Sequence, residues 1–594
     1  MKLSSLLRIS RPFAFVLLLS LFLLCFILTP LWNSQPGYML KGLVLITTII
    51  LGFGWAWWSS GEFRFISLRQ LLWFFMCFLL FLIMEFRNLT ASIPWRGDED
   101  YHIFCALQIA KSLFFHNLYF LILFLFLIFA WYRKSMDGKL VLGAFVFITF
   151  AAWGGQRAHI DIYHALRYPI FLNYLTALPV YVAAFFPTSP YPELPFRLFP
   201  LLSAIGLCGI CFYSLQGHSL LLRVGVAMAV ATLPIVRNYD SLFYLEMPAV
   251  FCMALVCSRA LQLLRSEPNQ IAQLPSWYAL LLLGFIKETT LPFLFAFLCC
   301  RLITRAESLF QKGNICWKTG LDELRIIFSV CFPIILYLFY RTHLGTTRSY
   351  SPHLNYLLDP SLYWIELQSL WDSFGLLLPF SIVGAIRLGS RRNWNLLLFL
   401  GLAFLLDLVF HFLDDQQYSG YSRFNLFLLP SLLALGLEGL RMVSGFKRAY
   451  VLAGLVVIVG TNICQSPVNT DGTRKTGWGV YGTDIGDQTY PYREALTYFQ
   501  KHHSHQKVLL TGHYYPYYTA FYTKEKDWPE QKYMEATRNE GARIDSTLKE
   551  LHDQGYQAVL YHLLADIPII KNKHGYEKTM VFKNQTHSLI LFSL

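Results

Sequence analysis

Apolar segments long enough to cross a lipid bilayer recur from residue 12 to residue 464 and then stop. Crossing about 30 Å of hydrocarbon takes roughly 20 consecutive apolar residues in a helix. The chain of 594 residues is 55% hydrophobic and only 14% charged, whereas soluble domains are about a quarter charged. These features predict a polytopic α-helical membrane protein with about 13 to 15 spans.

Lys and Arg are concentrated in short segments between the apolar runs, and the net charge is +13. Such clustering is typical of the positive-inside bias of membrane proteins and does not indicate nucleic-acid binding. The apolar run 12–31 is long, and no small-residue cleavage site follows it, so we expect a retained first helix and not a signal peptide.

The basic segments at the two ends of the chain predict one orientation. At the N-terminal end, the first basic residues, the segment around Arg64 and Arg69, and WYRKSMDGK alternate correctly with the apolar runs if all three are cytoplasmic. At the other end, the basic segments RLITRAESLFQKGNICWKTGLDELR, RLGSRRNW and RMVSGFKR all lie inside if the polar tail is outside. We therefore expect a cytoplasmic N-terminus and a periplasmic or extracellular tail. The outer tail, with no eukaryotic-type targeting signal, favours a bacterial inner membrane. The predicted outer segments are 87–114, 154–168, 237–246, 343–370, 411–423 and 465–594.

Two regions do not fit a simple count of crossings. The apolar stretches 168–187, 197–214 and 219–236 have to make two crossings, so we expect the first to lie along the membrane or enter it only partly. The stretch 276–304 is short for two passes.

The tail alternates helix-like and strand-like segments, with YREALTYFQKHH before KVLLTG and STLKELHDQGY before QAVLYHLL. We therefore predict two domains. Residues 1–464 form the transmembrane domain, and residues 465–594 form a small extracytoplasmic α/β domain.

Three consecutive acids, Asp98, Glu99 and Asp100, stand in PWRGDEDYH at an outer boundary. Apolar residues follow at helical spacing from Ile103, so acids here could simply cap a helix and complement its dipole. A carboxylate at this place could also take a proton from an acceptor hydroxyl. Asp98 and Asp100 together could hold a divalent metal ion.

Other polar residues occur at the predicted outer boundaries, and each permits two interpretations. Arginine suits bidentate phosphate recognition but also anchors helices at lipid head groups. Glu246 lies in a strongly apolar run, where an acid is a functional candidate, although a salt bridge to Arg237 or Lys287 would also explain it. The candidate substrate-binding residues are Asp100, Tyr101, His164, Arg167, Glu246, Lys287, Arg348 and Arg423.

The order of these segments resembles that of the glycosyltransferase C superfamily. PWRGDEDYHIFCALQIAKSL is similar to its first-loop signature. Further blocks that resemble the family follow in its order: HALRYPIFLNYLTALPVYV with PELPFRLFPLLSAIG, then YDSLFYLEMPAVF, LLLGFIKETTLPFL and YSRFNLFLLPSLLAL. Within the superfamily, the chain looks most like the protein mannosyltransferase and lipid A aminoarabinose transferase branch.

The resemblance implies an inverting glycosyltransferase. Its donor would be a sugar on polyprenyl phosphate or dolichyl phosphate, and its acceptor a hydroxyl or phosphate group on a lipid, glycan or protein. The resemblance makes Asp98 the catalytic base and Glu99 its support. It matches Glu246 to the second-loop acid and Arg423 to an arginine that meets the donor phosphate. No cofactor is implied with certainty, and a divalent metal ion is the one candidate.

The chain departs from the family pattern in three ways. Three spans precede the acidic loop instead of one, an extra hairpin occupies 115–153, and Arg167-Tyr168-Pro169 stands where the family has Lys-Pro-Pro or His-Pro-Pro. A transporter or flippase would also line a membrane cavity with acids and arginines, and a non-catalytic relative would only bind lipid-linked saccharide. We see no internal symmetry of the kind that transporters show.

Overall fold

The computed structural model describes only parts of the chain. The described stretches are 178–186, 193–215, 217–265, 288–312, 358–414, 425–443, 448–465, 508–510, 552–555, 557–564, 577–583 and 587–593, together with isolated positions elsewhere.

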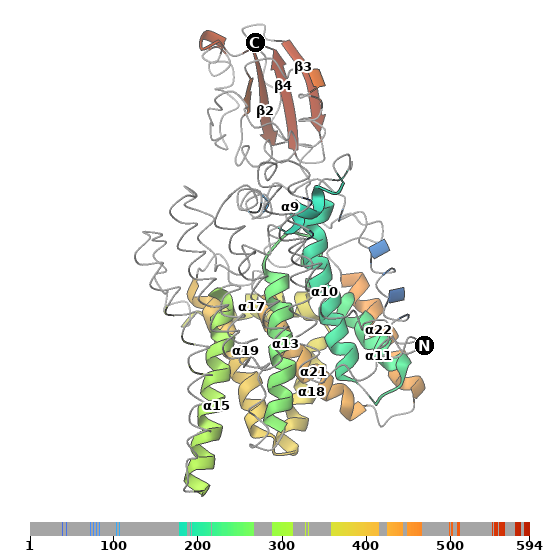
Figure 1. The fold of residues 1–594 in the computed structure, drawn as a ribbon, viewed down its shortest axis with the longest axis vertical. Helices are drawn as coiled ribbons and strands as arrows, with labels where there is room; N and C mark the ends of the chain where they lie inside the picture. The colour runs from blue at the N-terminus through green and yellow to red at the C-terminus, as the bar shows by residue number, and fades with distance from the viewer. Residues whose placement is uncertain are drawn as a thin grey trace, which may run out of the picture.

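A helical bundle occupies the region before residue 465, and a β-sheet lies beyond one end of it (Figure 1). The described helices of the bundle are α9 (Leu178–Ala183), α10 (Leu194–Ser214), α11 (Leu220–Ala231), α12 (Pro234–Tyr239), α13 (Glu246–Arg265), α15 (Leu291–Lys312), α17 (Pro360–Phe374), α18 (Leu377–Ser390), α19 (Trp394–Asp414), α21 (Leu429–Val443) and α22 (Arg448–Gln465). Two 3₁₀ turns, η3 (Glu288–Thr290) and η6 (Leu426–Leu428), lead into α15 and α21.

Helix α10 alone, among the described helices, is long and apolar enough to cross a membrane by itself. The pair α17 and α18 makes a second such element if it is counted as one span, although its two halves meet at 99°. The remaining apolar helices in the described stretches are shorter than this test requires. The stretch 168–187 was expected to lie along the membrane or to enter it only partly. Residues 178–183 of this stretch form the short helix α9, and residues 168–177 lie outside the described part of the chain.

Helices α18 and α21 cross in close backbone contact. A Cβ atom added at Gly384 would collide with the carbonyl oxygen of Leu435, and one at Gly439 would collide with that of Phe380. The hydroxyl of Ser381 donates to the carbonyl oxygen of Leu432 across the crossing at 2.9 Å. Small residues at these positions let the two backbones touch, as in closely packed membrane helices.

Two predicted loops contain helix. The predicted outer segment 343–370 includes most of α17, which begins at Pro360 behind the N-cap Asp359. The basic segment that begins at Arg301 is also helical, because α15 continues to Lys312. Both segments carry apolar residues between their polar ones, so local periodicity favours helix there in spite of the charge.

The sheet has the strand order β1-β2-β4-β3, with β1 (Val508–Leu510), β2 (Ala558–Leu564), β3 (Glu577–Lys583) and β4 (His587–Ser593). Strands β1 and β2 are parallel, so the chain must cross over between them. The antiparallel pairs β2–β4 and β3–β4 complete the sheet. The strands predicted in KVLLTG and QAVLYHLL are confirmed as β1 and β2.

Candidate functional site

Most of the predicted site residues lie outside the described part of the chain. These residues are Asp98, Glu99, Asp100, Tyr101, His164, Arg167, Lys287, Arg348 and Arg423. After the acidic triplet, the described residues Ile103 and Ala106 are helical and buried. The helix predicted after the acids is therefore confirmed at these two residues. The described candidate is Glu246.

Glu246 is the first residue of α13 and is only 1% exposed. An acid at a helix start is stabilised by the free backbone N–H groups and the helix dipole. Its apolar neighbours Leu245 and Met247 are also buried. A carboxylate so fully removed from water is costly to keep charged unless polar groups surround it.

The turn before Glu246 is held by aromatic packing. Phe243 makes an edge contact with Phe196 of α10, with ring centroids 5.3 Å apart, and a second one with Phe199 at 6.4 Å. Tyr244 packs against Tyr239 at 6.0 Å, across the turn. This packing fixes the chain between α12 and α13, and with it the buried polar residues Arg237, Asn238, Asp240 and Ser241.

Arg197 links this region to the segment that precedes the acidic triplet. Arg197 lies in the first turn of α10 and is 1% exposed. Its guanidinium donates from Nη1 to the carbonyl oxygen of Leu89 at 3.5 Å. Leu89 is itself buried, nine residues before Asp98 in the sequence. A buried cation therefore lies beside the chain that leads to the three acids.

Helix α17 contributes a polar stripe to the same end of the bundle. Glu366, Ser369 and Ser373 are spaced for one helical face, and all three are buried. Asn425, just before η6, donates from Nδ2 to the hydroxyls of Ser369 at 2.8 Å and Ser373 at 3.3 Å. Its Oδ1 accepts no hydrogen bond from the described residues although it is buried, so the amide has capacity for one more donor.

These groups belong together, because α12 packs against α17 and α13, and α13 packs against η6. We call the set the polar layer. Its members are Arg197, Arg237, Asp240, Glu246, Glu366, Ser369, Ser373 and Asn425. The layer offers carboxylates, hydroxyls, an amide and two guanidinium groups, which are the groups that recognise phosphates and sugar hydroxyls.

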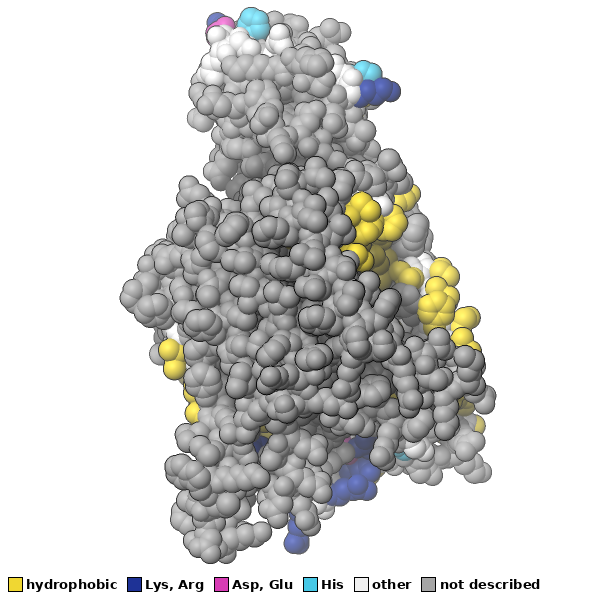
Figure 2. Space-filling view, in the orientation of Figure 1, with side chains coloured by type: hydrophobic (Ala, Val, Ile, Leu, Met, Phe, Trp, Pro, Cys, Tyr) yellow, Lys and Arg dark blue, Asp and Glu magenta, His cyan; other side chains and the backbone are white. Residues whose placement is uncertain are grey.

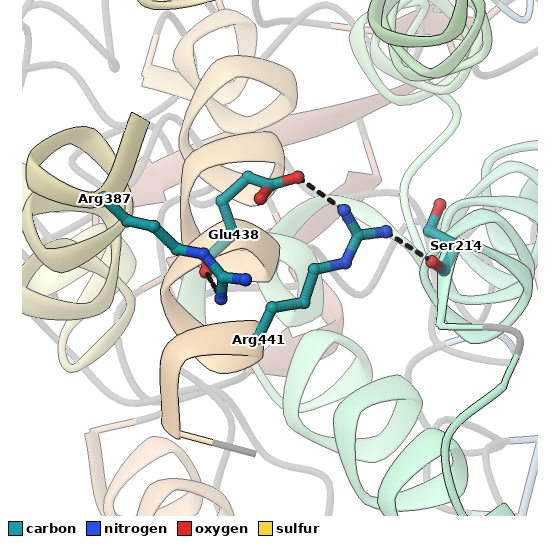
Figure 3. A network of polar contacts seen from close by, with 4 residues as sticks. All are labelled: Ser214, Arg387, Glu438 and Arg441. Atoms are coloured by element: carbon teal, nitrogen blue, oxygen red, sulfur yellow. Dashed lines mark hydrogen bonds and ion pairs between the residues drawn. The ribbon is translucent and has the colours of Figure 1, made fainter. Parts of the chain in front are cut away.

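A second polar network lies near the C-terminal ends of α18 and α21, away from the polar layer (Figure 3). Arg387 donates from Nη1 to the carbonyl oxygen of Glu438 at 3.0 Å. Arg441 pairs with the Glu438 carboxylate at 2.5 Å and donates to the carbonyl oxygen of Ser214, at the end of α10, at 2.9 Å. The basic segments RLGSRRNW and RMVSGFKR were predicted on one side, and these contacts confirm that they lie at one end of the bundle. We call this the basic end.

Sequence reasoning missed several buried polar residues. Glu366 and Ser369 fall in the predicted outer segment 343–370, and Ser373 follows it. The helical spacing of the three residues was the signal that could have found them. Asp407 of α19 was not among the predicted candidates, yet it is 1% exposed and its Oδ2 accepts no hydrogen bond from any described residue. One acid in a long apolar run was a sufficient signal for a candidate.

No group of three or more metal-binding side chains occurs among the described residues, which do not include Asp98 and Asp100. No protein-family model and no curated protein matches this sequence.

Proposed function

We propose that this chain is a polytopic membrane glycosyltransferase. It would move a sugar from a polyprenyl-phosphate or dolichyl-phosphate donor to a hydroxyl or phosphate acceptor, on the membrane side that faces the polar layer and the C-terminal sheet. Asp98 is the proposed general base and Glu99 its support. The remaining predicted residues, Asp100, Tyr101, His164, Arg167, Glu246, Lys287, Arg348 and Arg423, would bind substrate.

Membrane embedding is supported by what the helices expose. Large apolar side chains are more than half exposed on several helices, whereas charged groups such as Glu246 and Arg197 are buried. Figure 2 shows apolar side chains along the flank of the bundle. Extensive exposed apolar surface of this kind marks contact with lipid or with another protein.

One observation carries the proposal. The sequence blocks that resemble the glycosyltransferase C superfamily are far apart along the chain, and several of them contribute to the polar layer. Arg197 comes from the second block, Glu246 from the third, and Asn425 from the closing block, while Leu89 leads into the first. Scattered interfacial anchors would not be expected to converge.

The chemistry needs few parts, because the sugar–phosphate bond is already activated. A base must accept the acceptor proton as the acceptor oxygen attacks the anomeric carbon, which is worth roughly 10² to 10⁴ in rate. Cationic groups must meet the charge that develops on the departing polyprenyl phosphate. Arg237 and Arg197 are buried cations in the described polar layer, and Arg423 is the proposed contact outside it.

The test is transfer by the purified full chain with a labelled polyprenyl phosphate sugar and mixed envelope acceptors. Asp98→Asn keeps the shape of the side chain and removes the base. We expect at least a hundredfold loss of transfer with this variant and a small change with Lys549→Gln, which alters an exposed residue of the C-terminal region. Unchanged transfer by Asp98→Asn would remove the base assignment. Loss of transfer on adding a chelator would establish a metal requirement.

A transporter or flippase is the second candidate, and the 99° break between α17 and α18 favours it. Transporters often place discontinuous helices at their substrate sites. In vesicles, a flippase would move intact labelled donor between leaflets and leave the sugar–phosphate bond uncleaved. Cleavage of the donor by the wild type, lost in Asp98→Asn, would exclude this alternative.

A further inference from the structure

Four arginines gather at the basic end, around the turn that joins α18 to α19. Arg387 and Arg441 converge on Glu438 from two helices (Figure 3), and Arg391 and Arg392 follow α18 directly and are exposed. The described side chains of this network and turn thus include four guanidinium groups and one carboxylate. Figure 2 shows basic side chains at the end of the molecule remote from the sheet.

The turn holds the two exposed arginines in a fixed geometry. Asn393 N donates to the Leu388 carbonyl oxygen at 2.9 Å and Arg392 N to that of Gly389 at 2.9 Å, which is the Schellman pattern for ending a helix. Arg392 has φ of 57°, the left-handed conformation that usually requires glycine. An arginine therefore occupies a position where the backbone alone would favour glycine.

Apolar surface adjoins this basic turn on both helices. Ile382 and Ile386 follow each other at one-turn spacing on α18, and they are 62% and 60% exposed. On α19, Trp394 is 61% exposed and Leu398 continues the same face. Basic residues directly beside an exposed apolar surface, with a tryptophan at the boundary, are typical of the part of a membrane protein that lies at the depth of the lipid head groups.

We propose that the basic end is a binding site for the phosphate head group of an anionic phospholipid in the leaflet opposite the polar layer. Arg391 and Arg392, with Arg387 behind them, would meet the phosphate, and the face that includes Ile382, Ile386 and Trp394 would lie against the acyl chains. Juxtamembrane arginines gain free energy from anionic lipid in this way. The proposal requires membrane embedding but not glycosyl transfer.

The experiment measures lipid binding by native mass spectrometry of the full chain extracted from vesicles. One set of vesicles is pure phosphatidylcholine, and the other contains phosphatidylglycerol. We expect preferential retention of phosphatidylglycerol and a loss of about tenfold in its affinity in the double variant Arg391→Gln/Arg392→Gln. The matched control Lys501→Gln/Lys549→Gln removes two exposed charges elsewhere and should leave binding unchanged.

A second variant separates binding from folding. Arg392→Gly relieves the left-handed conformation, so the protein should unfold at a higher temperature while it binds phosphatidylglycerol several-fold more weakly. The proposal is wrong if the double glutamine variant retains phosphatidylglycerol as the wild type does, if phosphatidylcholine is retained equally, or if the control variant loses binding to the same extent. Competition by inorganic phosphate at equal concentration would mean a free-phosphate site and would also overturn it.

Discussion

Asn425 donates a hydrogen bond to the hydroxyl of Ser369 at 2.8 Å, which joins the segment before η6 to the buried face of α17. Both side chains are almost fully buried, so neither can be solvated if the bond is broken. The contact thus stabilises the packing of an irregular segment against a helix, at the centre of the polar layer.

Asn425→Ala removes this bond and the weaker one to Ser373. We expect a loss of about 1–3 kcal/mol in the free energy of unfolding, because the hydroxyls left behind are buried. Thermal unfolding in detergent measures the change. Ser390→Ala is the control, since it removes an exposed hydroxyl that bonds only within its own helix, and it should change stability little. Equal effects of the two variants would contradict a structural role for Asn425.

Adding a methyl group should have opposite effects on stability at two helical glycines, one at the crossing of α18 and α21 and one away from it. Gly384→Ala adds a methyl group against the Leu435 carbonyl oxygen, and the two helices must separate, at a cost of about 1–3 kcal/mol. Gly401→Ala, in α19, adds the same group where, beyond its own stretch of helix, no described residue comes within 4 Å. It should stabilise the protein by about 0.5–1 kcal/mol, because alanine is the better helix former. A stable Gly384→Ala variant would rule out this close packing.

The sequence predicted the apolar helix α10, the strands β1 and β2, and the shared end of two basic segments. Each of these leaves a local pattern, either apolar continuity or clustered charge. The pairing of Asn425 with Ser369 has no such pattern, because it depends on how two segments 56 residues apart meet.

The polar layer shows the same limit. Glu366 lies between apolar residues of α17, in a stretch that the sequence predicts as an outer segment. Composition does not reveal that α17 meets α18 at an angle of 99°. The bend at Gly375, where φ is 48°, puts the polar face of α17 against the bundle and leaves Trp364 exposed. A glycine signals that a turn is permitted, but its direction is set by packing.

Phe243 anchors the turn that precedes Glu246, so its removal should affect stability and activity together. Phe243→Ala leaves a cavity against Phe196 and Phe199, which should cost about 3–5 kcal/mol. If the proposed transferase activity is correct, the loosened turn should also lower kcat. Phe295→Ala, at a residue 52% exposed, is the control and should have a smaller effect on both unfolding temperature and transfer. A Phe243→Ala variant with wild-type stability would show that the turn is held by other contacts.

Asp359 links pH to the stability of α17. The hydroxyl of Ser361 donates to its carboxylate at 2.6 Å and the backbone N–H of Ser361 at 2.9 Å, and these bonds lower the pKa of Asp359 below its ordinary value of 3.8. Because the folded pKa is the lower one, this contribution to stability is fully present above pH 3.8 and is lost as the pH falls through the folded pKa. Asp359→Asn keeps a good N-cap without a titrating group, so its unfolding temperature should fall less than that of the wild type on acidification. At pH 7, Asp359→Ala should be the least stable of the three proteins, because it alone lacks a side chain that caps α17. An Asp359→Asn variant as sensitive to acid as the wild type would assign the pH dependence to other carboxylates.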